Sequence, residues 1–291
     1  MAKIGYLNSG TESGVADLTG KFIEGLNSNV EIIWKFANCN YAHLPRLAEQ
    51  LVEQRVNVIA TTGGFVSYKA AVEARAAAGA TLTIPILFIV GTARAVLPHW
   101  PPQNATGVDI LGTDHIRQRI DTLRQLLDHN QQAKAKIALL VRPRTDISDL
   151  DEGEARQTDA NVVFIPVTND DFEAAFRSAV EQNVKGLIVS ADPCFTIQRA
   201  TIVRLARQHH IFAVYPWREY LGACGLMSHG GSLPDAYRQV GEYTKRILNG
   251  ESAQSLPIIS ATLGNPVIKK STADALGLTI PPSLAAGAEI I

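Results

Sequence analysis

The sequence has little cysteine, almost no net charge and no long apolar run, and each absence excludes a class of protein. Its three cysteines have no C-x-x-C spacing and no H-E-x-x-H occurs, so a metal site has little support and none is predicted. The formal net charge of −1 gives no strong field to attract nucleic acid or an anionic membrane. The longest apolar run, residues 84–90, is far shorter than the roughly 20 residues of a membrane-spanning helix.

Signatures of enzymes are missing as well. No G-x-G-x-x-G or G-x-x-x-x-G-K-[ST] follows a predicted strand, so no nucleotide or other cofactor is predicted. No G-x-S-x-G elbow occurs, which leaves His229 without a visible serine nucleophile. A catalytic carboxylate pair of Asp192 and Glu219 stays open, but binding pockets also use carboxylates, and we do not expect an enzyme.

The sequence does contain the same order of strand-like and helix-like segments twice. Hydrophobic residues make up 46% of the 291 residues, which is typical of a globular protein. Short β-rich runs alternate with amphipathic helical stretches, and this alternation predicts parallel sheets covered by helices. The paired segments are residues 2–7 and 135–141, 53–64 and 181–193, 84–92 and 211–219, and 105–110 and 225–230.

This repeat predicts an α/β fold of two Rossmann-like lobes. The N-terminal lobe is expected to span residues 1–112 plus about 235–260, and the C-terminal lobe residues 113–234 plus about 261–291. Ligands of open parallel sheets bind outside the carboxyl ends of the strands. Two lobes that face each other would therefore place both sets of post-strand loops against one cleft, where we expect a small-molecule site.

The run T-T-G-G-F-V-S, residues 61–67, is a candidate anion site at this cleft. It combines a strand end, two glycines and a helix start. Amides at a helix N-terminus, with Thr and Ser hydroxyls beside them, suit a small carboxylate. The alternative is an ordinary glycine turn with Ser67 inside the first helical turn, and the position of the run favours anion binding.

Two further runs belong to the other lobe. The turn S-A-D-P-C-F, residues 190–195, places Asp192 just after a buried strand, where its carboxylate could hold an ammonium group, cap the next helix, or do both. In the run at residues 214–231, Tyr215 and Trp217 are expected to alternate with their neighbours along a strand. They either line the pocket or pack under a helix.

The complete set of predicted ligand-binding residues lies on the loops after the predicted strands. It consists of Asn8, Ser9, Thr62, Gly63, Gly64, Ser67, Gly91, Thr92, Asp109, Asp192, Phe195, Tyr215, Trp217, Glu219, Ser228 and His229.

Several motifs carry a resemblance to a known family. They are A-D-P-x-F at residues 191–195, Y-x-W-R-E at 215–219, the following G-L-M-S-x-G at 225–230, and A-L-G-L-T-I-P-P-S at 275–283. With them, nearly the whole chain resembles the ABC transporter substrate-binding proteins of the TrpX-like, type 1 periplasmic-binding family. The resemblance implies two hinged lobes that close on a small solute and present it to a membrane permease. It also implies that the solute can be an amino acid, including an aromatic one.

The chain also departs from the family pattern. Residues 90–96, V-G-T-A-R-A-V, stand where the family commonly has a G-G-D-P-V-like turn, so a carboxylate is missing. Residues 142–162 look short for the helix that normally follows the second lobe's first strand. Family members are exported to the periplasm, and we interpret Met1 as the start of a segment without its leader peptide.

The sequence thus predicts a solute-binding component of an ABC import system. The alternative is the effector-binding core of a LacI-like transcriptional regulator, which shares the two-lobed fold. That alternative expects a DNA-binding helix-turn-helix ahead of Met1, whereas transport expects a leader peptide there.

Overall fold

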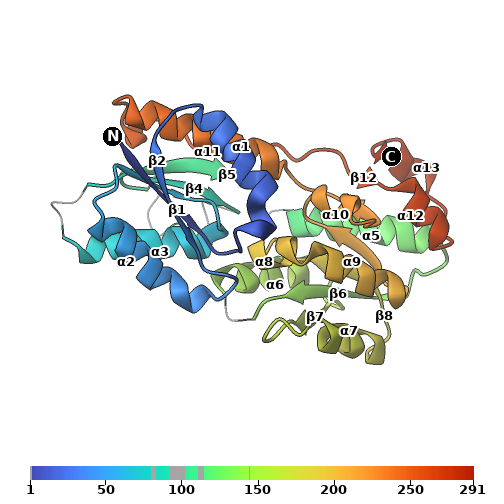
Figure 1. Cartoon of the computed structure of the whole chain (residues 1–291). Coiled ribbons are helices and arrows are strands. Elements are labelled where there is room, and N and C mark those ends of the chain that lie inside the picture. The colour runs from blue at the N-terminus through green and yellow to red at the C-terminus, as the bar shows by residue number, and fades with distance from the viewer. Residues whose placement is uncertain are drawn as a thin grey trace. The chain divides into compact units, whose positions relative to one another are not determined.

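The computed structural model describes residues 2–79, 83–91, 93, 97, 102–110, 115–143 and 145–291. The chain divides into two compact units. Unit 1 comprises Met1–Ile110 and Ser232–Ala261, and unit 2 comprises Leu111–Gly231 and Thr262–Ile291. Each unit has its own sheet with helices around it (Figure 1).

The sheet of unit 1 is entirely parallel among its described strands and has the order β11-β5-β4-β3-β1-β2. These strands are β1 (Lys3–Asn8), β2 (Glu31–Phe36), β3 (Val58–Thr61), β4 (Ile86–Val90), β5 (Ala105–Asp109) and β11 (Ile259–Ser260). Every residue of β3, β4 and β5 is buried. Burial of both faces explains why β3 and β4 read as nearly continuous apolar runs rather than as alternating patterns.

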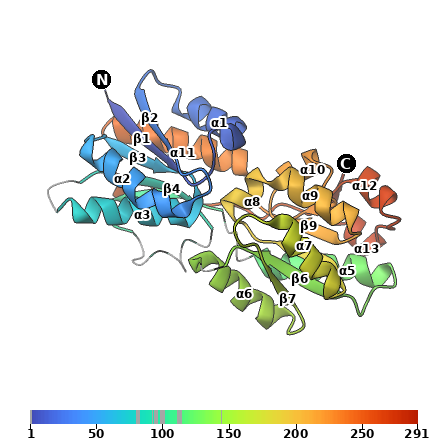
Figure 2. The same cartoon turned by 60° about the horizontal axis from the view of Figure 1, so that its bottom comes forward.

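Among the described residues, four helices cover this sheet in two pairs. Helix α1 (Ala16–Leu26) packs against α11 (Leu233–Leu248), and α2 (Leu44–Glu53) packs against α3 (Gly64–Ala77) on the other face (Figures 1 and 2). Local sequence signals set both ends of α11. Ser232 Oγ accepts from the amide of Asp235, and Gly250, just past the helix end, has a φ of 100° that favours glycine.

The sheet of unit 2 has the order β13-β12-β10-β9-β8-β6-β7. Its strands are β6 (Lys136–Val141), β7 (Val163–Pro166), β8 (Val184–Val189), β9 (Phe212–Tyr215), β10 (Met227–Ser228), β12 (Val267–Ile268) and β13 (Glu289–Ile290). The pair β10–β12 is antiparallel and the other described pairs are parallel. The expectation of a wholly parallel sheet is therefore wrong at this edge, where the chain returns after α11.

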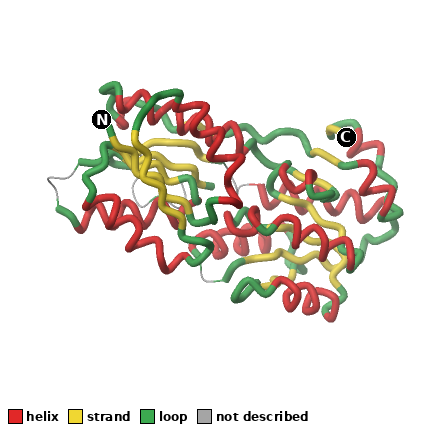
Figure 3. Tube along the Cα trace, in the orientation of Figure 1, coloured by secondary structure: helices red, strands yellow, loops and turns green. Residues whose placement is uncertain are grey.

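Helices cover both faces of this second sheet, and Figure 3 shows them around its strands. They are α5 (Ile116–His129), α6 (Asp146–Thr158), α7 (Phe172–Glu181), α8 (Pro193–Ile197), α9 (Arg199–Gln208), α10 (Glu219–Gly222), α12 (Lys270–Ala275) and α13 (Pro282–Ala285). Helix α5 packs against α6, and α7 packs against α9. Since α6 has 13 residues, segment 142–162 does hold a full helix.

One expected strand is shorter than predicted. The segment at residues 211–219 is a strand only as far as Tyr215, and a turn then leads into α10 at Glu219. Pro216 has no amide hydrogen and cannot continue the ladder. The expected alternation of Tyr215 and Trp217 along one strand is therefore wrong.

Both sheets contain a point where the chain reverses its direction of winding. In unit 1, β2 lies on one side of β1, and β3 lies on the other. In unit 2, β7 and β8 flank β6 in the same way. Outside the carboxyl ends of two such strands lies a crevice that neither crossover covers, and ligands of open α/β sheets bind there.

Candidate functional site

The switch point of unit 1 holds a buried network of polar side chains. Asn8 Nδ2 donates to Thr62 Oγ1 at 3.0 Å and to the Tyr237 hydroxyl at 3.3 Å. Thr62 Oγ1 donates to the Tyr6 hydroxyl at 2.6 Å, and the Tyr237 hydroxyl donates to the carbonyl of Thr62 at 2.9 Å. Burial raises the pKa of Tyr6 well above its ordinary value, so the network is neutral at physiological pH. It holds the ends of β1 and β3 in one arrangement.

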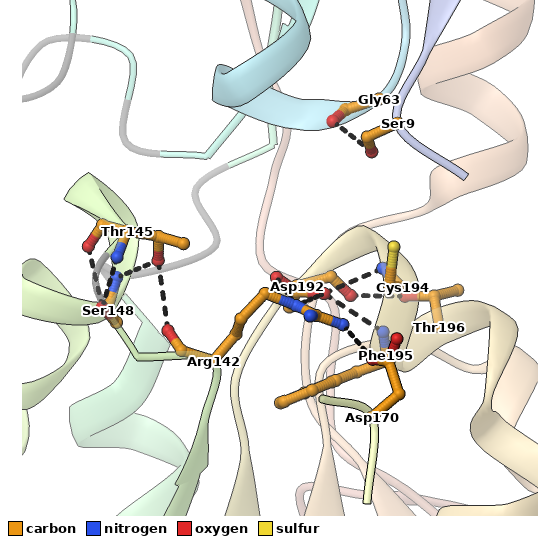
Figure 4. Close-up of polar contacts among 10 residues, drawn as sticks. All are labelled: Ser9, Gly63, Arg142, Thr145, Ser148, Asp170, Asp192, Cys194, Phe195 and Thr196. Carbon is orange, nitrogen blue, oxygen red and sulfur yellow. Dashed lines mark hydrogen bonds and ion pairs between the residues drawn. The ribbon is translucent and has the colours of Figure 1, made fainter. Parts of the chain in front are cut away.

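Gly63 lies where β1 and β3 come closest after their ends. Ser9 Oγ donates to the carbonyl of Gly63 at 2.8 Å (Figure 4), and Ser67 Oγ donates to the same carbonyl at 3.3 Å. A Cβ at position 63 would lie 2.1 Å from the backbone nitrogen of Ser9. Glycine is required here because a side chain would force the two loops apart.

This arrangement changes the expected chemistry of residues 61–67. The hydroxyls of Ser9, Thr62 and Ser67 already donate to acceptors within unit 1. Helix α3 begins at Gly64, and its N-cap, Gly63, makes no side-chain capping bond. The backbone amides of the first turn, rather than the hydroxyls, are the donors suited to an anion here.

Asp109 ends β5 and binds the turn that follows β4. Its Oδ2 accepts from the amide of Ala93 at 2.9 Å, and the side chain is buried. Gly91 begins that turn and is half-buried. Thr92, the other predicted ligand-binding residue of this turn, lies outside the described residues.

In unit 2, Asp192 follows β8 at the second switch point and caps α8. Its Oδ1 accepts from the amides of Cys194 at 2.9 Å and Phe195 at 3.2 Å (Figure 4). Arg142, which follows β6, places Nε 3.4 Å from Asp192 Oδ2 and donates from Nη2 to Asp170 at 2.6 Å. The capping role that the sequence left open is confirmed, while the ammonium-binding role stays a prediction.

Two of the predicted aromatic residues pack inside unit 2. Phe195 is fully buried and meets Phe172 edge to face, with ring centroids 5.5 Å apart. Tyr215 is 1% exposed and stacks on Tyr220, with centroids 4.6 Å apart and planes 14° apart. For Tyr215, packing within the fold is therefore the better of the two interpretations.

Trp217 and Glu219 lie in the turn beyond β9. Trp217 is buried, and a Cβ at Gly230 would lie 3.3 Å from its Cε3. Glu219 is half-buried at the start of α10, and burial raises the pKa of its carboxyl above the ordinary value. Its sequence neighbour Arg218 instead forms two 2.6 Å hydrogen bonds with Glu289.

Ser228 ends β10 and His229 follows it, and both residues are buried. His229 Nδ1 lies 3.3 Å from Thr122 Oγ1. Burial, together with the charge of Arg119, lowers the pKa of His229 to about 4. The imidazole is therefore neutral at pH 7.

Arg119 is a residue of this edge that the sequence analysis missed. It lies on α5, is fully buried, and donates from Nε to the carbonyl of His229 at 2.9 Å. A sequence signal existed, because Arg119 falls on the apolar stripe of α5 between Ile116 and Leu123. A charged residue on such a stripe is an exception that needs an explanation.

The described residues provide neither a metal site nor a membrane-spanning helix. These residues contain no group of three or more His, Cys, Asp or Glu side chains placed to hold a metal ion. They also contain no helix with the length and apolar character needed to span a membrane.

Comparison with known proteins gives both a family and a fold. The model of the ABC transporter substrate binding protein family matches residues 9–290. No curated protein sequence matches the chain. A conserved domain protein from Vibrio cholerae O1 biovar El Tor is 21% identical, with 99% of each chain covered and a TM-score of 0.83. An ABC domain from Streptococcus pneumonia in complex with L-Trp is 18% identical, with 100% of this chain and 99% of that chain covered and a TM-score of 0.81.

A third structure, of a ligand-free substrate binding protein with adhesive properties from Clostridium difficile, is 18% identical. It covers 100% of this chain and 99% of its own, with a TM-score of 0.61. These likenesses confirm the predicted type 1 periplasmic-binding fold. The matching family consists of solute-binding proteins and not of enzymes. Since its model spans nearly the whole sequence, the chain belongs to the ABC transporter substrate-binding protein family.

Proposed function

We propose that this chain is the solute-binding component of an ABC import system and that it closes two lobes around one small molecule. The observation that carries the proposal is the position of the polar side chains. In unit 1, Asn8 ends β1 and Ser9 follows it. In unit 2, Arg142 follows β6 and Asp192 follows β8, and these strands lie at the two switch points. This is where open α/β sheets bind ligands.

The lobes of the proposal are units 1 and 2, and the three chain connections between them form the hinge. A solute bound in the cleft contacts the carboxyl edges of both sheets. Binding then favours the closed arrangement, because each lobe supplies only part of the contacts. The closed form is the one that a membrane permease would recognise, on the periplasmic side where proteins of this family function.

The proposed solute is an amino acid or an aromatic carboxylate. The first-turn amides of α3 suit an anionic or carbonyl oxygen, since the N-cap residue, Gly63, makes no side-chain capping bond. In unit 2, Trp217 offers an apolar surface, and Asp192 and Glu219 offer carboxylates for an ammonium group or a hydroxyl. The L-Trp complex of the relative from Streptococcus pneumonia makes L-tryptophan the first solute to test.

The remaining contacts are proposed to come from the loops around these groups. They are Asn8, Ser9, Thr62, Gly63, Gly64, Ser67, Gly91, Thr92, Asp109, Ser228 and His229. Phe195 and Tyr215 are proposed to support the residues that contact the solute, because their own rings pack within unit 2.

A thermal-shift screen of protein stripped of ligand by unfolding and refolding tests this function. The panel contains amino acids, aromatic acids, amines and small sugars. A solute at a hundredfold excess over its Kd stabilises the protein by about 2.7 kcal/mol, which raises the midpoint by several degrees. The proposal fails if no solute raises the midpoint, or if the best solute is chemically converted during incubation.

A further inference from the structure

Arg119 is a buried cation held in a fixed position at the carboxyl edge of unit 2. It lies in the first turns of α5 and is 0% exposed. Its Nε donates to the carbonyl of His229, the residue that follows β10, at 2.9 Å. This bond fixes the plane of the guanidinium group, so the two terminal nitrogens have a defined direction.

Those two nitrogens lack acceptors. Over the part of the chain that the structure describes, neither Nη1 nor Nη2 of Arg119 has a hydrogen-bond partner, although both atoms are buried. An unpaired buried charge is costly, and buried arginines are normally paired with carboxylates or carbonyls. The two terminal nitrogens therefore call for acceptors that the described residues do not supply, and an anion would provide them.

Among the described residues of unit 2, a carboxylate acts on Arg119 through its charge, but none bonds to the two terminal nitrogens. The buried Asp151 is near enough to attract Arg119 through its charge, but neither Asp151 nor the nearby Tyr220 bonds to the terminal nitrogens of Arg119. Burial outweighs this attraction and lowers the pKa of Arg119 to about 10, so the guanidinium stays charged at neutral pH. His229 is neutral at that pH, as described above, and adds no second positive charge.

Arg124, five residues further along the same helix, shows how an arginine of this fold is satisfied by acceptors within the protein. Its guanidinium donates to Asp159 at 2.5 and 3.1 Å and to the carbonyl of Ala135 at 2.7 Å. Arg119 makes one such bond where Arg124 makes three. The contrast supports a role for Arg119 beyond folding.

We propose that Arg119 binds the carboxylate of the transported solute through Nη1 and Nη2. The planar guanidinium matches the two oxygens of a carboxylate, and its orientation is fixed before the solute arrives. This inference rests on the proposed function and narrows it, because it selects organic acids and amino acids over amines and sugars. The α3 amides of unit 1 are then left to bind another oxygen of the solute.

The test compares Arg119→Met with Arg124→Met as a matched control. Binding of L-tryptophan and of tryptamine, which lacks the carboxylate, is measured by titration calorimetry, and the best organic acid from the solute screen is measured in the same way. For R119M we expect the Kd of the carboxylate solute to rise at least about 30-fold. The affinity for tryptamine, already weak, should change little. R124M should lose some thermal stability and keep wild-type affinity.

Each other outcome overturns the inference in a recognisable way. If R119M binds the carboxylate solute as tightly as the wild type, Arg119 is not the anchor, although solute binding itself stands. If R119M lowers the affinity for the carboxylate solute and for tryptamine equally, Arg119 is a structural residue. The same conclusion follows if R119M unfolds at a much lower temperature than R124M. If the wild type binds no solute at all, the proposed function falls first and the inference falls with it.

Discussion

Arg142 Nε lies 3.4 Å from Asp192 Oδ2, and this pair joins the ends of β6 and β8 at the switch point of unit 2. Asp192 Oδ1 meanwhile accepts from two amides at the start of α8. One carboxylate therefore caps a helix and pairs with an arginine at the same time. Its negative charge is partly balanced within unit 2, so an ammonium group of a solute would share it with Arg142.

Asp192 variants separate these roles. Asp192→Asn keeps an oxygen that can cap α8, so the unfolding midpoint should stay within a few degrees of the wild type. It removes the charge, so binding of L-tryptophan should weaken, while binding of indole-3-propionate, which has no ammonium group, should not. Calorimetric titration of both solutes checks this.

Asp192→Ala serves as the structural control. It removes the cap and should cost roughly 0.5–2 kcal/mol of stability in denaturant unfolding. Equal affinity of Asp192→Asn and wild type for L-tryptophan would show that Asp192 acts only as a helix cap and ion-pair partner.

Gly63 should tolerate no side chain. A Cβ at this position would lie 2.1 Å from the Ser9 nitrogen and 2.4 Å from Ser67 Oγ, so Gly63→Ala must displace the loop after β1. We expect a loss of at least about 2 kcal/mol in urea unfolding. Gly20→Ala is the control, because position 20 is an exposed site in α1 with no atom within 4 Å of an added Cβ. That change should be stabilising by about 0.5–1 kcal/mol, and an equal response of the two variants would contradict the close approach.

The hydroxyl of Tyr237 should matter more than that of Tyr243 on the same helix. The first donates to the carbonyl of Thr62 and accepts from Asn8 inside the buried network, whereas the second donates to the half-buried carbonyl of Pro257. Tyr237→Phe removes the hydroxyl that donates to the buried carbonyl of Thr62 and takes one of two acceptors from Asn8 Nδ2, so it should cost about 1–3 kcal/mol. Tyr243→Phe should cost less. The reverse order in thermal unfolding would show that the network is not what holds β1 to β3.

His229 should make the protein acid-sensitive. The pKa of its imidazole is about 4 in the folded chain against an ordinary value of 6.5, so the unfolded chain takes up a proton that the folded chain resists. The contribution of the neutral His229 imidazole to the free energy of unfolding is complete above pH 6.5 and is lost as the pH falls toward 4. The unfolding midpoint of the wild type should therefore fall more steeply over this interval than that of His229→Gln. Parallel curves for the two proteins would contradict the low pKa.

Much of the fold could be predicted because the local signals agree with the packing. The buried strands β3, β4 and β8 read as apolar runs bounded by turns, and their positions repeat in the two halves. The edge strands β2 and β7 were missed, since partly exposed strands give weaker patterns. The two-residue strands β12 and β13 are too short for any periodicity.

Only those residues of the candidate site that lie just after predicted strands could be predicted from the sequence. Asp192 follows a strand and carries a cap signature, so its position was evident from sequence. The stacking of Tyr215 on Tyr220 depends on the turn that Pro216 starts, which an extended-strand interpretation does not include. Arg119 comes from a helix rather than from a post-strand loop, and only its place on an apolar stripe marked it.

The most direct test of the account is to identify what the native protein carries. Protein purified without refolding is denatured, the released small molecules are identified by mass spectrometry, and the released compound is titrated back into stripped protein. We expect a single carboxylate-bearing solute that rebinds unchanged with one site per chain. Release of nothing that rebinds, or recovery of the compound in a converted form, would contradict a solute-binding function.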